Sequence, residues 1–142
     1  MMCVHAVMII FQTGYYFGCS SCSLTVTVIG KRCFADGDVK KFEYYINDGV
    51  HGSFATAVSH NFLQCLPVLL CPVTADQEKY STTLWGQTCD SVDKICVTSF
   101  PELNIGDRLY FEDMGGYTMS RISTFNGFSP PTKFYYINEN DR

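Results

Sequence analysis

The chain has 142 residues, of which 46% are hydrophobic and 17% are charged, so it can build the core of one domain or of part of a larger protein. Its net charge of −4 provides no basic face, which argues against nucleic acid and membranes as partners. The eight cysteines are scattered and several lie in apolar runs, unlike those of a small secreted disulfide scaffold. We therefore expect a globular protein whose thiols are reduced and mostly buried.

The first residues, MMCVHAVMIIFQ, do not have the pattern of a secretion signal. No basic side chain precedes their apolar part, since the first one is Lys31, and no small-residue cleavage site follows cleanly. The run is also too short to span a bilayer. We expect a buried strand here and a cytoplasmic protein.

The rest of the chain has a mainly β pattern. In SLTVTVIGKR, residues 23–32, apolar Leu24, Val26 and Val28 alternate with hydroxyl residues, which is the period of a strand. The polar stretch FADGDVKK, residues 34–41, predicts a loop. Further β-type runs, separated by turn residues, are FEYYIN (42–47), KICVTSF (94–100), DRLYF (107–111) and KFYYIN (133–138). The pattern predicts a compact β-barrel or sandwich.

Three other segments have weaker patterns. Short helices are expected around Phe54 to Leu66 and around Tyr117 to Thr124, although neither has a clear cap. VTADQEKYS, residues 73–81, is expected to be a flexible insert.

Cys19 and Cys22 form a single C-x-x-C pair, which could belong to a zinc site or a redox pair. No second pair has similar spacing, and His5, His51 and His60 are not spaced as metal ligands. We therefore expect no metal site, and two cysteines packed near the start of a strand. Histidines such as His51 and His60 are more often hydrogen-bonded surface groups than catalysts.

Cys89 is followed directly by Asp90, and Asp93 lies three residues further on. A neighbouring carboxylate disfavours the thiolate form of a cysteine. The pair therefore favours either a protonated thiol that can donate its proton or a plain turn with no chemistry, and the residues alone leave both open.

Four segments, taken in order, resemble the C-terminal β-domain of eukaryotic ornithine decarboxylases. These enzymes belong to a group of pyridoxal-phosphate-dependent decarboxylases that also includes antizyme inhibitor. The segments are YYINDGVHGSF (44–54), LWGQTCDSVD (84–93), PELNIGDRLYFEDMGGYT (101–118) and STFNGF (123–128). The resemblance extends back through residues 23–32 to VMIIFQTGYY, so it assigns residues 1–142 to this mainly β, barrel-like domain. It makes residues 1–14 a remnant of the last strand and following loop of the family's cofactor-binding barrel.

The resemblance implies roles for four residues. Family members pair head to tail, so that each active site spans two chains. On that basis Cys89 would protonate the decarboxylated carbon in the partner's site, and Asp90 would receive the distal amino group of the substrate. Tyr117 matches a tyrosine that binds the phosphate of pyridoxal phosphate, and Phe125 matches an aromatic residue that lines the pocket.

The chain also departs from the family pattern. Gln12 replaces a carboxylate that holds the proton of the cofactor ring, and Tyr15 replaces an arginine that binds its phosphate. His60 stands where decarboxylases have a second carboxylate for the amine, and His51 replaces an interface tyrosine. Because the resemblance also provides no barrel and no Schiff-base lysine, we expect this chain alone to be inactive and not to bind pyridoxal phosphate.

Two functions remain open. One is an ornithine decarboxylase-like protein of polyamine (putrescine) biosynthesis, a fragment or divergent copy that donates Cys89 and Asp90 to a decarboxylase subunit in a homo- or heterodimer. Tyr117 and STFNGF favour this function. The other is a non-catalytic regulator like antizyme inhibitor, with antizyme as a partner, and QTGY and His60 favour such an inactive chain. A degenerate gene without a stable product is a third alternative.

Overall fold

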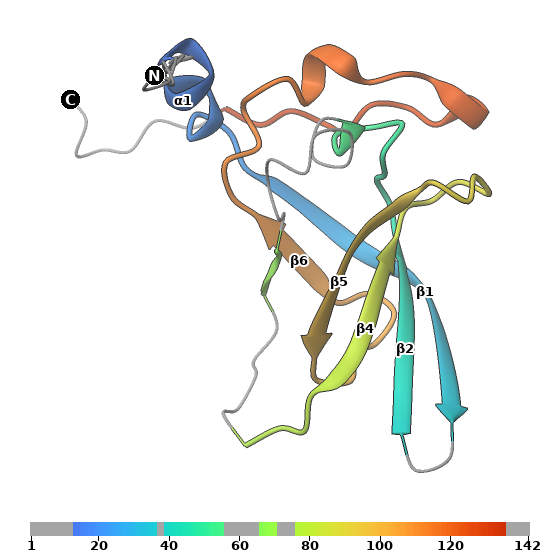
Figure 1. The fold of residues 1–142 in the computed structure, drawn as a ribbon. Coiled ribbons are helices and arrows are strands. Elements are labelled where there is room, and N and C mark those ends of the chain that lie inside the picture. Colours follow the sequence, from blue (N-terminus) through green and yellow to red (C-terminus); the bar gives the residue numbers. More distant parts are fainter. Residues whose placement is uncertain (1–12, 37–38, 56–65, 71–75, 136–142) are drawn as a thin grey trace, which may run out of the picture.

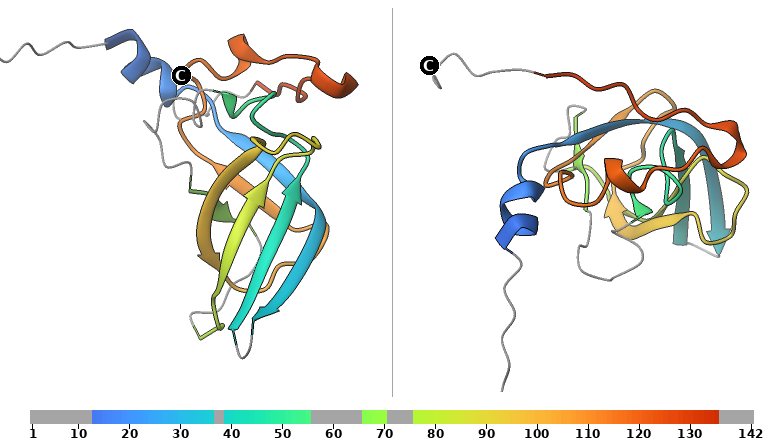
Figure 2. Two further views of the ribbon diagram at one scale, coloured as in Figure 1. Left: turned by 45° about the vertical axis from the view of Figure 1, so that its right-hand side comes forward. Right: turned by 90° about the horizontal axis from the view of Figure 1, so that it is seen from above.

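The computed structural model describes residues 13–36, 39–55, 66–70 and 76–135. Their main element is a six-stranded sheet with the order β3-β6-β1-β2-β4-β5 (Figure 1). The strands are β1 (Leu24–Asp36), β2 (Val39–Ile46), β3 (Val68–Leu69), β4 (Tyr80–Trp85), β5 (Lys94–Phe100) and β6 (Arg108–Phe111). β2 and β4 run parallel, and the other neighbours are antiparallel. The long strands bend and curl the sheet into a half-barrel (Figure 2), which confirms the predicted mainly β, barrel-like fold.

The core lies on one face of this sheet. Successive side chains of a strand point to opposite faces, so Val26 and Val28 of β1 are buried together with Phe42, Tyr44 and Ile46 of β2. The other buried apolar residues of the cluster are Phe54, Leu84, Phe100, Leu103, Leu109, Phe111 and Met114. The alternation in residues 23–32 therefore identified β1 and its buried face.

The hairpin of β1 and β2 is longer than predicted. Residues 34–36 and 39–41, predicted as loop, continue the two strands in register, with Phe34 opposite Lys41. Both side chains are exposed, because this end of the hairpin extends beyond the core. Polar residues can form strands there, so the loop prediction was wrong for these residues.

Two strands were not predicted, and one predicted strand is not present where the chain is described. β4 begins with polar residues, and its Tyr80 and Ser81 fall within the predicted insert. β3 is only two residues long. Residues 133–135 of the predicted strand 133–138 form no strand, and Phe134 and Tyr135 are 86% and 90% exposed; residues 136–138 lie outside the described residues.

The helices are short. α1 (Thr13–Cys19) was not predicted, and it includes residues 13–14, which the sequence assigned to a loop. The helix expected around residues 117–124 is reduced to a 3₁₀ turn, η1 (Met119–Arg121), and a second turn, η2 (Phe125–Gly127), follows. Most of the helix expected around 54–66 lies outside the described residues, as does the N-terminal strand expected in residues 1–12. None of the helices in the described part of the chain has the length and apolar character needed to cross a membrane.

The hydroxyl of Tyr44 satisfies a buried backbone group. Tyr44 and Leu103 are fully or almost fully buried, and the Leu103 N–H donates a hydrogen bond of 2.8 Å to the Tyr44 hydroxyl. We expect Tyr44→Phe to lower the free energy of unfolding by about 1–3 kcal/mol, because it leaves a buried N–H without an acceptor. Urea denaturation measures this change. Tyr16→Phe is the matched control, since Tyr16 is 75% exposed and its loss of a hydroxyl should change stability by less than about 0.5 kcal/mol. Equal stability of Tyr44→Phe and the native chain would contradict the assignment.

Candidate functional site

The parallel pairing of β2 and β4 brings two loops to one end of the sheet. Parallel strands end at the same edge, so the turn after β2, residues 47–54, and the loop after β4, residues 86–93, lie side by side. The C-terminal segment, residues 113–135, passes over the same end of the sheet (Figure 1). Most of the side chains that the sequence singled out are on these three segments.

Asp93 joins the first two segments from inside. Its side chain is 1% exposed. One carboxylate oxygen, Oδ1, accepts from the Val50 N–H at 2.8 Å, and the other, Oδ2, accepts from the N–H and the hydroxyl of Thr88 at 3.0 and 2.6 Å. A buried carboxylate requires such donors, because its desolvation is otherwise very costly. Asp93 therefore links the β2 turn to the β4 loop.

Two glycines allow this close approach. A β-carbon at Gly49 or at Gly86 would overlap the carboxylate of Asp93. The Gly86 N–H also donates to the Asp93 carbonyl oxygen at 2.7 Å. Glycine at both positions is thus explained by the need for backbone to contact the carboxylate directly.

The side chains of Asp90 and His51 form a hydrogen bond between the two loops. The distance from His51 Nε2 to Asp90 Oδ2 is 2.8 Å, and both side chains are partly exposed. The other oxygen of Asp90, Oδ1, accepts from the Val92 N–H at 3.1 Å. These contacts, the Val92 hydrogen bond first and the His51 hydrogen bond second, lower the pKa of Asp90. Asp90 is therefore ionised at neutral pH.

The C-terminal segment covers this pair. The ring of Phe125 stacks on His51 with centroids 4.1 Å apart. The N–H and the hydroxyl of Ser123 donate to the His51 carbonyl oxygen at 2.9 and 3.1 Å. Asn126, which follows Phe125, has its side-chain amide 3.8 Å from the sulfur of Cys89. The side chain of Cys89 is exposed. Cys89, Asp90 and Phe125, to which the resemblance gave roles in one active site, thus lie at one surface.

His51 and Asn126 were not predicted as members of this site. The sequence identified His51 only as a replacement of an interface tyrosine. Its contact with Asp90 depends on the parallel pairing of β2 with β4, which local periodicity cannot indicate. Asn126 lies in the quoted STFNGF motif, whose adjacent Phe125 was the residue singled out.

Tyr117 lies in a second cluster, beside α1. It has a left-handed backbone conformation with φ of 53°, it is 61% exposed, and its ring stacks on Tyr15 with centroids 5.9 Å apart. The preceding Gly115 and Gly116 pack tightly on α1, where a β-carbon would overlap its backbone or side chains. The sequence-predicted positions Gln12 and His60 lie outside the described residues.

The described cysteines form no disulfide, and they are less buried than expected. Cys33 and Cys89 are exposed, and Cys19, Cys22 and Cys96 are partly exposed. Cys33 lies in β1 opposite Phe42, and Cys89 lies in the loop after β4. Among the described residues there is no group of three side chains suited to hold a metal ion.

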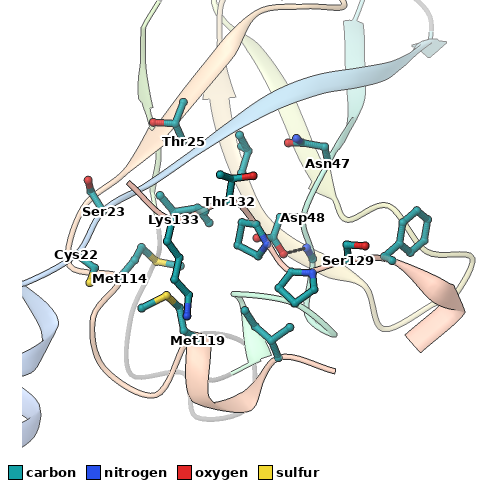
Figure 3. A pocket seen from close by; sticks show the side chains of 18 of the residues that line it. Cys22, Ser23, Thr25, Asn47, Asp48, Met114, Met119, Ser129, Thr132 and Lys133 are labelled. Atoms are coloured by element: carbon teal, nitrogen blue, oxygen red, sulfur yellow. Dashed lines mark hydrogen bonds between the residues drawn. The ribbon is translucent and has the colours of Figure 1, made fainter. Parts of the chain in front are cut away.

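An open cavity of about 1460 Å³ lies next to the His51 and Phe125 pair, and both residues contribute to its wall. Figure 3 shows residues that line it from the start of β1, from the β2 turn and from the C-terminal segment, among them Thr25, Asp48 and Lys133. Asp48 is buried, and its Oδ1 accepts from the N–H groups of Gly49 and Ser53 at 2.7 and 2.9 Å. The carboxylate of Asp48 therefore stabilises the turn that carries His51.

A family model and curated relatives agree on the family to which the chain belongs. The family described as "Pyridoxal-dependent decarboxylase, C-terminal sheet domain" matches residues 9–115. The chain is 42% identical to a probable ornithine decarboxylase of Dictyostelium discoideum, over 92% of this chain and 30% of that protein. It is 40% identical to antizyme inhibitor 2 of Xenopus laevis, over 91% of this chain and 30% of that protein. The chain thus spans about a third or less of the length of these curated relatives.

Two solved structures have a similar fold. The arginine decarboxylase of Paramecium bursaria Chlorella virus, bound to agmatine, matches with a TM-score of 0.74 and 36% identity, over 82% of this chain and 31% of that chain. A lysine/ornithine decarboxylase from Vibrio vulnificus, complexed with cadaverine, matches with a TM-score of 0.68 and 27% identity, over 82% of this chain and 30% of that chain.

The pKa of Asp90 provides a direct test of the site geometry. We expect His51→Phe to raise this pKa, because the variant keeps a ring to stack on Phe125 and loses the donor to Asp90. The pKa should stay below the ordinary value of about 3.9, since the Val92 N–H still donates. Titration of the Asp90 carboxyl carbon by NMR measures it, with Cys33→Ala in β1 as the control that should leave it unchanged.

The same shift determines how Asp90 affects stability. Because folding lowers this pKa, the stabilisation is present above the ordinary carboxyl pKa of about 3.9 and is lost as the pH falls through the folded value. His51→Phe should therefore lose less stability in acid than the native chain. An Asp90 pKa that is the same in both proteins would contradict the hydrogen bond from His51.

Proposed function

We propose a role in the decarboxylation of a dibasic amino acid for this chain, which belongs to the family of pyridoxal-dependent decarboxylases through its C-terminal sheet domain. In this role the domain contributes the thiol of Cys89 and the carboxylate of Asp90 to an active site built on a barrel domain. The supporting observation is that an exposed thiol, an ionised carboxylate and an aromatic ring share one surface. Ornithine is the first candidate substrate, since ornithine decarboxylases are among the curated relatives.

Asp90 would bind the distal end of the substrate. It is ionised at neutral pH, and 28% of its side chain is exposed, so an ammonium group can approach it. An ammonium ion held by a carboxylate beside an aromatic ring is a favourable arrangement, because both attract the cation. The carboxylate would thereby orient a substrate that has a second amino group.

Cys89 would supply the proton that completes the reaction. When CO₂ leaves, the bond between the α-carbon and the carboxylate breaks and its electron pair stays with the α-carbon. The Cys89 thiol then gives its proton to that carbon, and the remaining thiolate recovers a proton from water. The amide of Asn126, 3.8 Å from the sulfur, can donate a hydrogen bond to the thiolate during this interval.

Pyridoxal phosphate, when bound, supplies the electron sink for the loss of CO₂. The described residues are suited to bind only the phosphate of this cofactor. The exposed phenol of Tyr117 can donate to a phosphate oxygen, whereas Tyr15, stacked against it, offers no charge. The ammonium groups of Lys31 and Lys94 lie over aromatic rings of the sheet, 5.2 and 6.0 Å from the ring centres. We therefore propose that the Schiff-base lysine and the cationic phosphate ligands come from a barrel domain.

The proposed partner is a decarboxylase subunit, in a homodimer or a heterodimer that makes putrescine for polyamine synthesis in the cytoplasm. A second candidate function is a regulator like antizyme inhibitor, with antizyme as the partner. It is favoured by the 40% identity to antizyme inhibitor 2, which is close to the 42% identity to the Dictyostelium protein. The two functions differ in whether Cys89 takes part in chemistry.

Complementation distinguishes them. A full-length ornithine decarboxylase in which the thiol and carboxylate equivalent to Cys89 and Asp90 are both replaced is mixed with this chain, and release of labelled CO₂ is followed. We expect activity to appear, to fall by about 100-fold or more with Cys89→Ala because the proton donor is lost, and to require more substrate with Asp90→Asn. Cys33→Ala is the control, since that thiol is exposed on the distant hairpin.

Failure of the mixture to release CO₂, although the two chains co-elute, would overturn the catalytic role. Binding of antizyme by this chain in the same preparation would then support the regulatory role. Absence of both association and antizyme binding would contradict both functions.

A further inference from the structure

We propose that His51 is a specificity-determining residue that makes cation binding at Asp90 depend on protonation of the imidazole. In the neutral state the imidazole leaves a net negative charge at the subsite, and in the protonated state it cancels that charge. The identity of the natural cation, the distal ammonium of a dibasic amino acid, rests on the proposed function. The dependence of cation binding on the protonation of His51, which we call the gate, rests on contacts within this chain.

The hydrogen-bond geometry fixes the proton on one nitrogen. Asp90 is ionised, and an ionised carboxylate can only accept hydrogen bonds. The 2.8 Å contact with Oδ2 therefore requires a proton on Nε2 of His51. A second proton can add only at Nδ1, so protonation changes the charge of His51 without breaking its contact with Asp90.

The imidazole is also prevented from leaving Asp90. Phe125 stacks on one of its faces, and Ser123 donates two hydrogen bonds to the His51 carbonyl oxygen. The preceding residue, Val50, is bound to the buried Asp93. A protonated His51 held in this way competes with an incoming ammonium group for the same carboxylate, whereas a mobile side chain would be displaced.

Carboxylates lie on the two loops around His51, and Lys133 of the C-terminal segment lines the same cavity. The β4 loop presents Asp90, with Asp93 buried behind it and the thiol of Cys89 beside it. The turn that carries His51 contributes the buried Asp48. The segment that packs on the ring offers a hydroxyl, a phenyl ring and an amide, from residues 123 to 126. When it is protonated, His51 is thus a cation in direct contact with one carboxylate, and its charge state changes how much negative potential is left for a ligand.

Diamine binding to the 142-residue chain tests this gate without any decarboxylase. The probe is 1,4-diaminobutane, whose amino groups stay protonated from pH 6.0 to pH 8.5, as do ordinary alkylamines with a pKa of about 10.4. Its dissociation constant is measured from the NMR shifts of Asp90 and Cys89 at both pH values. The proteins compared are the native chain, His51→Phe and His51→Tyr, which both keep a ring against Phe125 and remain uncharged.

At pH 6.0, where more of the imidazole carries a second proton than at pH 8.5, we expect both variants to bind the diamine about 3- to 10-fold more tightly than the native chain. At pH 8.5 the three proteins should agree within about twofold, because a neutral imidazole no longer cancels Asp90. Lys41→Gln, which removes one exposed positive charge from β2, should behave as the native chain at both pH values. This control separates a local effect from a change in net charge.

Equal diamine affinity of the native chain and the His51 variants at pH 6.0, or a ratio that does not change with pH, would overturn the inference. So would a diamine that fails to shift Asp90 in every protein. The proposed function fails separately, if the complementation mixture releases no CO₂ while the diamine still binds in the pH-dependent way described.

Discussion

The candidate site depends on the burial of one carboxylate. Asp93 is almost completely removed from solvent, and its charge is satisfied only if the Val50 N–H and both donors of Thr88 converge on it. These donors belong to two loops that are far apart in the sequence. The cost of leaving a buried carboxylate without donors therefore fixes the position of one loop relative to the other. The contacts of Cys89, Asp90 and Phe125 cross that junction or lie next to it.

The parallel pair of β2 and β4 makes this junction possible, and the C-terminal segment completes it. The sheet brings the loops to one edge, Asp93 joins them, and the hydrogen bond of His51 with Asp90 then forms across the junction. Phe125 covers the pair from a third segment. The rigid part of the fold thus carries a surface made of loops, where an exposed thiol and a partly exposed carboxylate can reach a ligand held by another domain.

How much of this could be read from the sequence depended on the range of each interaction. The alternation of Leu24, Val26 and Val28 is local, and it gave the correct strand and the correct buried face. β4 begins with tyrosine, serine and threonine, and it is stabilised by its pairing with β2 and β5, which a local pattern does not report. The aromatic run at 133–135 shows the opposite error, since β-propensity has no effect without a neighbouring strand.

The residues of the site, like the strands, could be predicted only where the interaction is local in the sequence. The adjacency of Cys89 and Asp90 is visible in the sequence, and the resemblance to a family suggested roles for both. The contact of Asp90 with His51 spans 39 residues and depends on strand order, so it could not be predicted. The buried position of Asp93 was missed as well, because aspartate in a polar loop is usually exposed. Only its donors and the two glycines against it explain why it is inside.

Hydrogen exchange in Asp93→Asn tests most directly whether this carboxylate assembles the site. Asparagine keeps one acceptor oxygen and replaces the other with a donor, so it cannot accept from both Val50 and Thr88. The account predicts that the amide of at least one of these residues exchanges about tenfold faster or more, while amides in the β1 and β2 hairpin keep their protection. Unchanged protection at both Val50 and Thr88 would contradict it.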